Sequence, residues 1–265
     1  MVYNEILNNI YFIGDIHGEF QAIKIPNLSD AIVIVCGDCG FGFHKNQYYT
    51  NIFPKLNKHC IKHNIKVYMF RGNHDDPSYF DGEKIKYSNI IAIPDYSVIV
   101  TPNHNILCVG GAISVDRTWR LGCLSWNINS YSFFHNCSKA EAEQQVIKGY
   151  WEDEPPVYKE EELDKILEQY NIDIIATHTA PNCAFPRNDI YAKPGLERWL
   201  QKDENLSKDL DYERGVMDKI YKKVQPKYWF YGHFHDHWVE NYDNTRFYLL
   251  NMYINGKVDA GTITE

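Results

Sequence analysis

The sequence lacks several features that would set it apart from ordinary globular proteins. It has no apolar run near the roughly 20 residues that a membrane-spanning helix needs. Its first residues, MVYNEILNNIYFIGD, show no basic segment followed by an apolar stretch, so no secretory signal is expected. No internal repeat, low-complexity tract or Gly/Ser/Pro linker divides the chain, and we therefore expect a single domain over residues 1–265.

Paired cysteines are absent and positive charge is in the minority. The seven cysteines are odd in number, scattered and without a C-x-x-C pair, which argues against a disulfide framework or a zinc ribbon. A cytoplasmic location is expected. The net charge of −8 argues against extended nucleic-acid binding, which would need a basic face. A small anionic substrate stays compatible, because bound divalent cations can reverse the sign of charge locally.

Apolar runs alternate with helical patterns along most of the chain. Strands are expected over residues 9–14, 31–38, 89–94, 96–102, 105–114, 172–178 and 228–235, and another over residues 65–75, which leads into a polar turn. Helices are expected over residues 47–64, 159–171 and 207–226, and another is expected to begin at Ser138, which has capping-box spacing to Glu141. This order predicts an α/β protein in which two sheets pack together with helices outside.

Two further segments carry weaker patterns. Residues 116–136 show no clear period, and a long surface loop is expected there. The acidic residues of segment 151–158 are interpreted as a solvated face. The pattern of residues 245–263 predicts a β-hairpin or paired edge strands around Asn255-Gly256.

Polar side chains lie just after the apolar run in five of the expected strands. They are Asp15 and His17, Asp38, Asn73 and His74, His178, and His233 and His235. Any one of these could be an ordinary polar turn, but ligand sites of α/β sheets gather beyond the carboxyl ends of strands. Oxygen donors mixed with imidazoles suit Mn, Fe, Zn, Co or Ni ions. The set is too large for one tetrahedral zinc, whereas two metal ions that share a carboxylate would use all of it.

Together these motifs resemble the signature of the calcineurin-like metallophosphoesterases, of the bacterial and phage type. The matching strings are Gly14-Asp15-Ile16-His17-Gly18, Gly37-Asp38, Arg71-Gly72-Asn73-His74-Asp75, Thr177-His178 and Gly232-His233-Phe234-His235. They stand in the family's order and run from residue 14 to residue 235. The resemblance implies a four-layer α/β/β/α sandwich of two packed mixed β-sheets flanked by helices.

The resemblance also implies a role for each residue. Asp15, His17 and His235 would bind one metal ion, and Asp38 would bridge to a second. Asn73, His178 and His233 would hold that second ion. His74 would be the catalytic general acid or transition-state donor, and Asp75 would either orient His74 or end the turn. The cofactors would be two divalent metal ions, with Mn first and Fe, Zn, Ni, Co or Mg as alternatives.

Three arginines are candidates for substrate binding. Arg71 precedes the Gly-Asn-His string, which is similar to that of Ser/Thr phosphatases. Arg117 and Arg120 lie in a segment that resembles one found in many bacterial and phage members of the family. Guanidinium groups clamp phosphate oxygens well, although salt bridges with nearby acids are an alternative for all three. The chain lacks the Asp-Arg-Gly string that Ser/Thr phosphatases carry near the bridging aspartate, so specificity for phosphoproteins is not implied.

The expected activity is hydrolysis of phosphomonoesters. A hydroxide bridging the two metal ions would attack phosphorus directly, without a phosphoenzyme. A phosphodiesterase acting on cyclic or short nucleotides is the alternative within this class, and a DNA nuclease is disfavoured by the acidic composition. A non-catalytic protein-docking module on the same fold is the alternative from another class. The expected partner is a phosphorylated small molecule or phosphoprotein, with no membrane.

Overall fold

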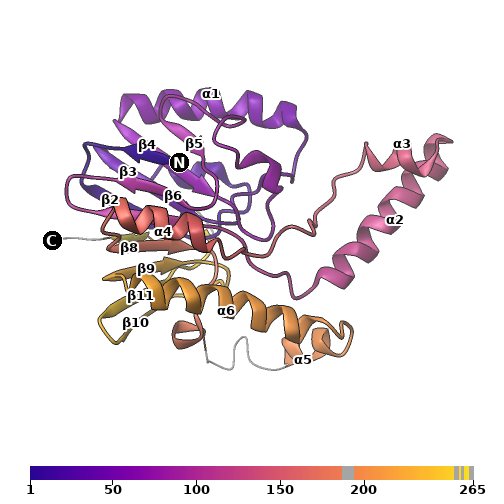
Figure 1. Ribbon diagram of the computed structural model, residues 1–265. Coiled ribbons are helices and arrows are strands. Elements are labelled where there is room, and N and C mark those ends of the chain that lie inside the picture. Colours follow the sequence, from indigo (N-terminus) through magenta and orange to yellow (C-terminus); the bar gives the residue numbers. More distant parts are fainter. Residues whose placement is uncertain (187–193, 254–256, 258–259, 263–265) are drawn as a thin grey trace.

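The structure is a computed structural model that describes residues 1–186, 194–253, 257 and 260–262 (Figure 1). Within these residues the strands form two mixed sheets. The larger sheet has the order β1 (Val2–Asn4), β6 (Ser97–Val100), β7 (Asn105–Val109), β8 (Ile174–Thr177), β9 (Tyr228–Tyr231), β11 (Thr245–Leu249) and β10 (Trp238–Tyr242). The smaller sheet has the order β12 (Ala260–Thr262), β2 (Asn9–Ile13), β3 (Ala31–Cys36), β4 (Ile65–Phe70) and β5 (Ile90–Ala92).

The strand β3 shows why the apolar runs become central strands. All six of its residues, AIVIVC, are buried, as expected for a strand that is covered on both faces. Val33 and Val35 belong to the apolar cluster on the helical side of the small sheet. Ile32 and Ile34 belong to the cluster between the two sheets. Because successive side chains of a strand point to opposite faces of the sheet, β3 contributes to two separate layers of the core.

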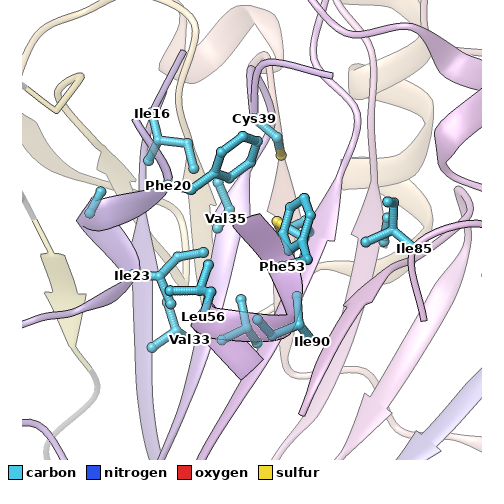
Figure 2. Packing of buried hydrophobic residues seen from close by; sticks show 14 of the residues in the cluster. Ile16, Phe20, Ile23, Val33, Val35, Cys39, Phe53, Leu56, Ile85 and Ile90 are labelled. Atoms are coloured by element: carbon cyan, nitrogen blue, oxygen red, sulfur yellow. The ribbon is translucent and has the colours of Figure 1, made fainter. Parts of the chain in front are cut away.

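Helices cover both outer faces. The helix α1 (Asn46–Lys62) packs on the small sheet, where Phe53 and Leu56 lie beside Val33, Val35 and Ile90 (Figure 2). The helices α4 (Glu160–Gln169) and α6 (Leu206–Val224) cover the large sheet through a second apolar cluster. The expected four-layer α/β/β/α sandwich is confirmed.

The two sheets pack through an apolar layer with no helix in it. Phe12 of β2 and Phe230 of β9 stack across this layer, with ring centroids 3.8 Å apart and planes at 4°. Ile10, Ile174 and other buried residues of both sheets complete the cluster. This packing sets the strand ends of one sheet beside those of the other.

The segment expected as a surface loop is helical. The helix α2 (Arg117–His135) and the short helix α3 (Lys139–Glu143) extend away from the sheets (Figure 1). Of the residues of α2, all of which the structure describes, none is buried. The predicted start of α3 is confirmed, because Ser138 and Glu141 form a capping box.

The C-terminal hairpin prediction is wrong for the strands that the structure describes. The strand β11 pairs with β9 and β10 in the large sheet, whereas β12 pairs with β2 in the small one. The turn expected at Asn255-Gly256 lies outside the described residues. The remaining elements are α5 (Pro194–Leu200) and the 3₁₀ helices η1 (Phe20–Ile23), η2 (Pro77–Tyr79) and η3 (Asn182–Ala184). None of the described helices is long and apolar enough to cross a membrane.

Candidate metal centre

The polar motifs meet where the two sheets adjoin. Asp15 and His17 follow β2, Asp38 follows β3, and Asn73 and His74 follow β4, all in the small sheet. His178 follows β8, and His233 and His235 follow β9, both in the large sheet. Because these strands run parallel within each sheet, their carboxyl ends share an edge. The site is therefore assembled from both halves of the sandwich.

Four of these residues form one compact donor cluster. Single ligand atoms of Asp15, His17, Asp38 and His235 all lie within 4.8 Å of one another. The Nε2 atoms of His17 and His235 are 3.0 Å apart, and His235 Nε2 is 3.5 Å from Asp15 Oδ1. Two imidazoles and two carboxylates facing a common point suit a divalent transition-metal ion. These residues fit the first expected metal site.

A second donor cluster adjoins the first through Asp38. Asn73 Oδ1 is 3.0 Å from both His178 Nε2 and His233 Nδ1. His178 Nε2 is also 3.2 Å from Asp38 Oδ1. The opposite ring nitrogen of His178, Nδ1, lies 2.7 Å from the carbonyl oxygen of Cys36. A backbone carbonyl can only accept, so Nδ1 carries the proton and Nε2 faces the cluster as a potential ligand.

The charged groups of the cluster shift one another's pKa values. Burial opposes ionisation of Asp38, but His178 and His74 outweigh it and hold the pKa of Asp38 well below its usual range. In turn, burial would lower the pKa of His178, but Asp38 and Asp15 raise it to about 10. Burial lowers the pKa of His233 to about 3. Binding of a cation would replace the proton that His178 holds between these carboxylates.

The backbone is strained at four of the seven candidate ligands. His17, Asp38, His233 and His235 have φ angles of 43°, 46°, 72° and 51°, in the left-handed region that residues with a Cβ rarely adopt. Such conformations persist only where the surroundings impose them, and they cluster at functional sites. Close packing adds a further constraint, because a Cβ at Gly72 would lie 2.1 Å from Asp38 Oδ1.

Asp75 fixes two of the ligand-bearing loops to each other. Its buried carboxylate accepts hydrogen bonds from the backbone N–H groups of residues 39–41, at 2.9, 2.7 and 2.9 Å. It also accepts one from the backbone N–H of Gly72, at 2.8 Å. The carboxylate thus joins the loop after β3 to the loop after β4. These contacts favour the turn-fixing role of Asp75 over the role of orienting His74.

His74 lies beside the donor clusters and in contact with Arg120. Its backbone N–H donates to Asp38 Oδ1 at 2.8 Å, and its ring nitrogens lie 3.1 and 2.9 Å from two guanidinium nitrogens of Arg120. Arg120 Nε donates to Asp116 Oδ1 at 2.6 Å. Burial and the charge of Arg120 lower the pKa of His74 to about 4, against the opposing effect of Asp38. The ring is therefore neutral near pH 7.

The structure does not bring Arg71 to the metal centre. Its guanidinium donates to Asp95 Oδ2 at 3.0 and 2.8 Å. It also donates to the backbone carbonyls of residues 153–155, at 3.0, 2.7 and 3.0 Å. These contacts agree with the salt-bridge alternative, and they anchor segment 153–155 to the end of β4.

Arg117 is likewise bound to acids rather than directed at the centre. Its Nε donates to Asp203 Oδ2 at 2.5 Å, and its NH2 group lies 2.7 Å from Asp209 Oδ2. These contacts tie the start of α2 to the start of α6. Of the three candidate arginines, Arg120 is the one whose guanidinium lies within hydrogen-bond distance of a candidate site residue, His74, in the described part of the chain.

Sequence reasoning missed a buried network behind Asn73. Asn73 Nδ2 donates to Ser114 Oγ at 2.9 Å, and the backbone N and Oγ of Ser114 donate to Glu154 at 2.6 and 2.7 Å. This network turns the Asn73 carbonyl oxygen toward the histidines. Burial raises the pKa of Glu154 to about 8. The expectation of a solvated face is wrong for Glu154, whose exposed fraction is 1%.

A family model described as calcineurin-like phosphoesterase matches residues 9–182. The chain belongs to this family. Calcineurin-like phosphoesterases generally bind divalent metal ions, and the cluster of Asp15, His17, Asp38 and His235 could hold one. The match ends before β9, so it does not cover His233 and His235, which the structure places beside the matched motif residues.

Two solved structures resemble this calcineurin-like phosphoesterase at a distance. Phosphopantetheinyl hydrolase from Mycobacterium tuberculosis has 14% identity and a TM-score of 0.42, over 92% of this chain and 89% of that one. A proposed 5′-nucleotidase from Staphylococcus aureus, in complex with alpha-ketoglutarate, has 11% identity and a TM-score of 0.42. The second match covers 92% of this chain but 49% of the other. No curated protein sequence matches the chain.

Proposed function

We propose that this calcineurin-like phosphoesterase hydrolyses phosphomonoesters with two divalent metal ions. The observation that carries the proposal is the convergence of two donor clusters on Asp38. The cluster around His17 and His235 lies on one side of this carboxylate, and the cluster around Asn73 and His178 lies on the other. A carboxylate shared in this way is suited to bridging two cations.

The donor sets determine what the residues would do for the metal ions. One ion would be held by Asp15, His17 and His235. The other ion would be held by Asn73, His178 and His233, and Asp38 would bind both ions. Oxygen and imidazole donors suit several divalent ions. We place Mn first, as the family resemblance implies, with Fe, Zn, Ni, Co or Mg as alternatives. When bound, the ions would neutralise phosphate oxygens and make a water acidic enough to supply hydroxide near neutral pH.

Two side chains beside the clusters would act on the substrate itself. The neutral ring of His74 can donate an N–H to the oxygen that leaves phosphorus, which stabilises the developing charge. Arg120 would bind phosphate oxygens with its guanidinium, whose orientation is fixed by the hydrogen bond to Asp116. Both groups would favour the transition state over the free ester.

A protein nucleophile is not needed for this reaction. Cys39, next to Asp38, is fully buried, and its Sγ lies 3.3 Å from the carbonyl oxygen of Phe70. Burial also raises the pKa of this thiol, so a reactive thiolate is disfavoured. These facts support direct attack by water, with inversion at phosphorus. We also propose that residues 1–265 form one cytoplasmic metallophosphoesterase domain, in keeping with cysteines that are unpaired throughout the described residues.

The test is hydrolysis of p-nitrophenyl phosphate and bis-p-nitrophenyl phosphate after chelation and re-addition of Mn²⁺. We expect metal-dependent turnover of the monoester, and we expect His74→Ala to lower kcat by about 100-fold with metal content unchanged. His59→Ala, at the end of α1, is the matched control and should keep wild-type activity.

Two other outcomes would replace the proposal. A strong preference for the diester would assign a phosphodiesterase of cyclic or short nucleotides. Tight metal binding without cleavage of either ester, or of phosphorylated natural substrates, would favour a protein-docking module on the same fold.

A further inference from the structure

A cavity of about 680 Å³ opens from the metal centre toward the helices α5 and α6. Asp38, Asn73, His74, His233 and His235 line one end of it. The rest of the lining is mainly apolar and includes Phe185, Leu196, Trp199, Leu200, Leu210 and Phe234. A phosphate held at the first end would therefore direct the rest of its molecule along an apolar wall.

The apolar wall begins at the candidate ligands themselves. Phe234 lies between His233 and His235 in sequence, and its ring centroid is 4.8 Å from that of His233. Phe185 packs edge-on against Phe234, with centroids 4.9 Å apart and planes at 78°. The first apolar surface that an ester meets beyond the metal centre is thus aromatic.

The far part of the wall is held in place by its own small core. Leu196, Trp199 and Leu200 of α5 pack on a buried cluster that includes Ile113 and Leu210. In Figure 1 the helix α5 lies beside the start of α6, which carries Leu210. A wall formed by packed side chains is available before a ligand binds, so little ordering is needed on binding.

Acidic side chains outnumber guanidinium and ammonium groups among the described lining residues of the cavity. Arg120 is the one guanidinium or ammonium group among the described lining residues, and it lies at the metal end against His74. The acids Glu197 and Glu213 also line the cavity. Glu213 already accepts hydrogen bonds from Ile113 N and Thr179 Oγ1. Arg198 and Lys202 lie 5.6 and 5.1 Å from the Trp199 ring and Arg214 lies 5.0 Å from the Phe185 ring, but none of the three is among the described lining residues. A further phosphate or carboxylate on the substrate would therefore meet acids within the cavity lining.

We propose that the cavity binds the alcohol portion of the substrate, and that this portion is bulky, apolar and without negative charge. The inference rests on the proposed function, since it assumes that a phosphate monoester occupies the metal centre. The volume is in the range of pockets that enclose a drug-sized ligand. Small polar alcohols would leave the apolar wall exposed to water, and nucleoside polyphosphates would bring uncompensated charge to it.

The hydrolytic test uses alkyl phosphates, whose alcohols differ in length but hardly in chemical reactivity. Ethyl, butyl, hexyl and octyl phosphate are compared in the Mn²⁺-loaded full chain. We expect kcat/KM to rise about fourfold for each CH₂ that enters the cavity. A phosphate ester of 6-hydroxyhexanoic acid, which places a carboxylate at the far end, should lose this gain.

Substitutions in the cavity wall test whether the dependence on alkyl length arises in this cavity. Trp199→Ala should reduce the ratio of kcat/KM for octyl phosphate to that for ethyl phosphate by about 10-fold or more. Trp126→Ala, on the exposed helix α2, is the matched control and should leave the ratio unchanged. An equal ratio in wild type and Trp199→Ala would contradict the assignment of the cavity.

A binding arm separates this inference from the proposed activity. Ethylphosphonate and octylphosphonate, which cannot be hydrolysed, are titrated calorimetrically into the same Mn²⁺-loaded protein. Tighter binding of octylphosphonate supports the apolar cavity even if no ester is cleaved, in which case the proposed activity alone fails. The inference would be overturned if the two phosphonates bound equally well and kcat/KM did not rise with the length of the alkyl phosphate. Normal turnover of p-nitrophenyl phosphate in the same protein would then show that the proposed activity is still correct.

Discussion

Arg117 and Arg120 lie three residues apart at the start of α2, but they make different contacts. Arg120 reaches the ring of His74, whereas Arg117 is bound to Asp203 and Asp209 of the α6 region. We expect Arg120→Ala to lower kcat/KM for p-nitrophenyl phosphate by about 100-fold, because a charged donor at the phosphate is lost. Its thermal midpoint should stay within about 2 °C of wild type.

Arg117→Ala is the matched control for that prediction. It should leave kcat/KM within about threefold of wild type and lower the free energy of unfolding by about 2 kcal/mol, because a charged hydrogen-bond partner of Asp203 is removed. Steady-state kinetics and urea unfolding of both variants measure this contrast. Equal kinetic losses in the two variants would show that Arg120 acts only through the position of α2.

Ser114 connects Asn73 to the buried Glu154 and should therefore influence metal binding without contacting the metal. Ser114→Ala removes the acceptor for Asn73 Nδ2 and one of the two donors to Glu154. We expect the affinity for the more weakly held Mn²⁺ to fall by 10- to 100-fold. Calorimetric titration of the metal-depleted protein with Mn²⁺ measures this change in affinity. Unchanged affinities for both ions would contradict a supporting role for this network.

Seven candidate ligands could be named from the sequence because each directly follows an apolar strand in a short motif. Ser114 and Glu154 carry no such signal, since they lie 40 residues apart and meet only after folding. Glu154 stands in an acidic run that resembles a solvated face, and its burial follows from the anchoring of segment 153–155 by Arg71. Local pattern thus predicted which residues converge, whereas the groups that support them depend on long-range packing.

Among the elements, α2 shows why a helix can escape prediction. The amphipathic period of a helix arises when one face packs on a core. Within the described structure, α2 buries none of its residues. Without a face packed on a core, burial does not impose a helical period on its apolar residues. The strands β2, β3 and β4 are the opposite case, because burial on both sheet faces makes them continuous apolar runs.

The exposure of α2 leads to a prediction about stability. Trp126 of α2 is 69% exposed, whereas Phe53 of α1 is fully buried. Trp126→Ala should change the free energy of unfolding by no more than about 0.5 kcal/mol. Phe53→Ala should lower it by about 3–5 kcal/mol, because it leaves a cavity in the core. Urea denaturation of the two variants provides the comparison. A loss of several kcal/mol in Trp126→Ala would mean that α2 is packed against a partner in solution.

At the scale of the whole molecule, the candidate metal centre spans the two sheets. The small sheet contributes Asp15, Asp38 and Asn73, and the large sheet contributes His178 and His233. Below this edge the sheets are held by apolar packing such as that of Phe12 on Phe230. Cations at the centre would add a polar connection between the sheets at the edge where their strands end. They would also offset the repulsion between the two buried carboxylates.

Metal removal should therefore destabilise the entire fold rather than one loop. Ions that bind only the native state, at free concentrations 100 times their Kd, would add about 2.7 kcal/mol to the free energy of unfolding. In a chain of this size that corresponds to a rise of about 5–10 °C in thermal midpoint on adding Mn²⁺ to chelated protein. Differential scanning calorimetry measures it. Asp38→Asn, which weakens both clusters, should lose most of the rise, whereas Asp211→Asn, on the exposed side of α6, should keep it. If the rise were the same in Asp38→Asn and wild type, the stabilising ions would have to bind elsewhere, and the connection between the sheets at Asp38 would be wrong.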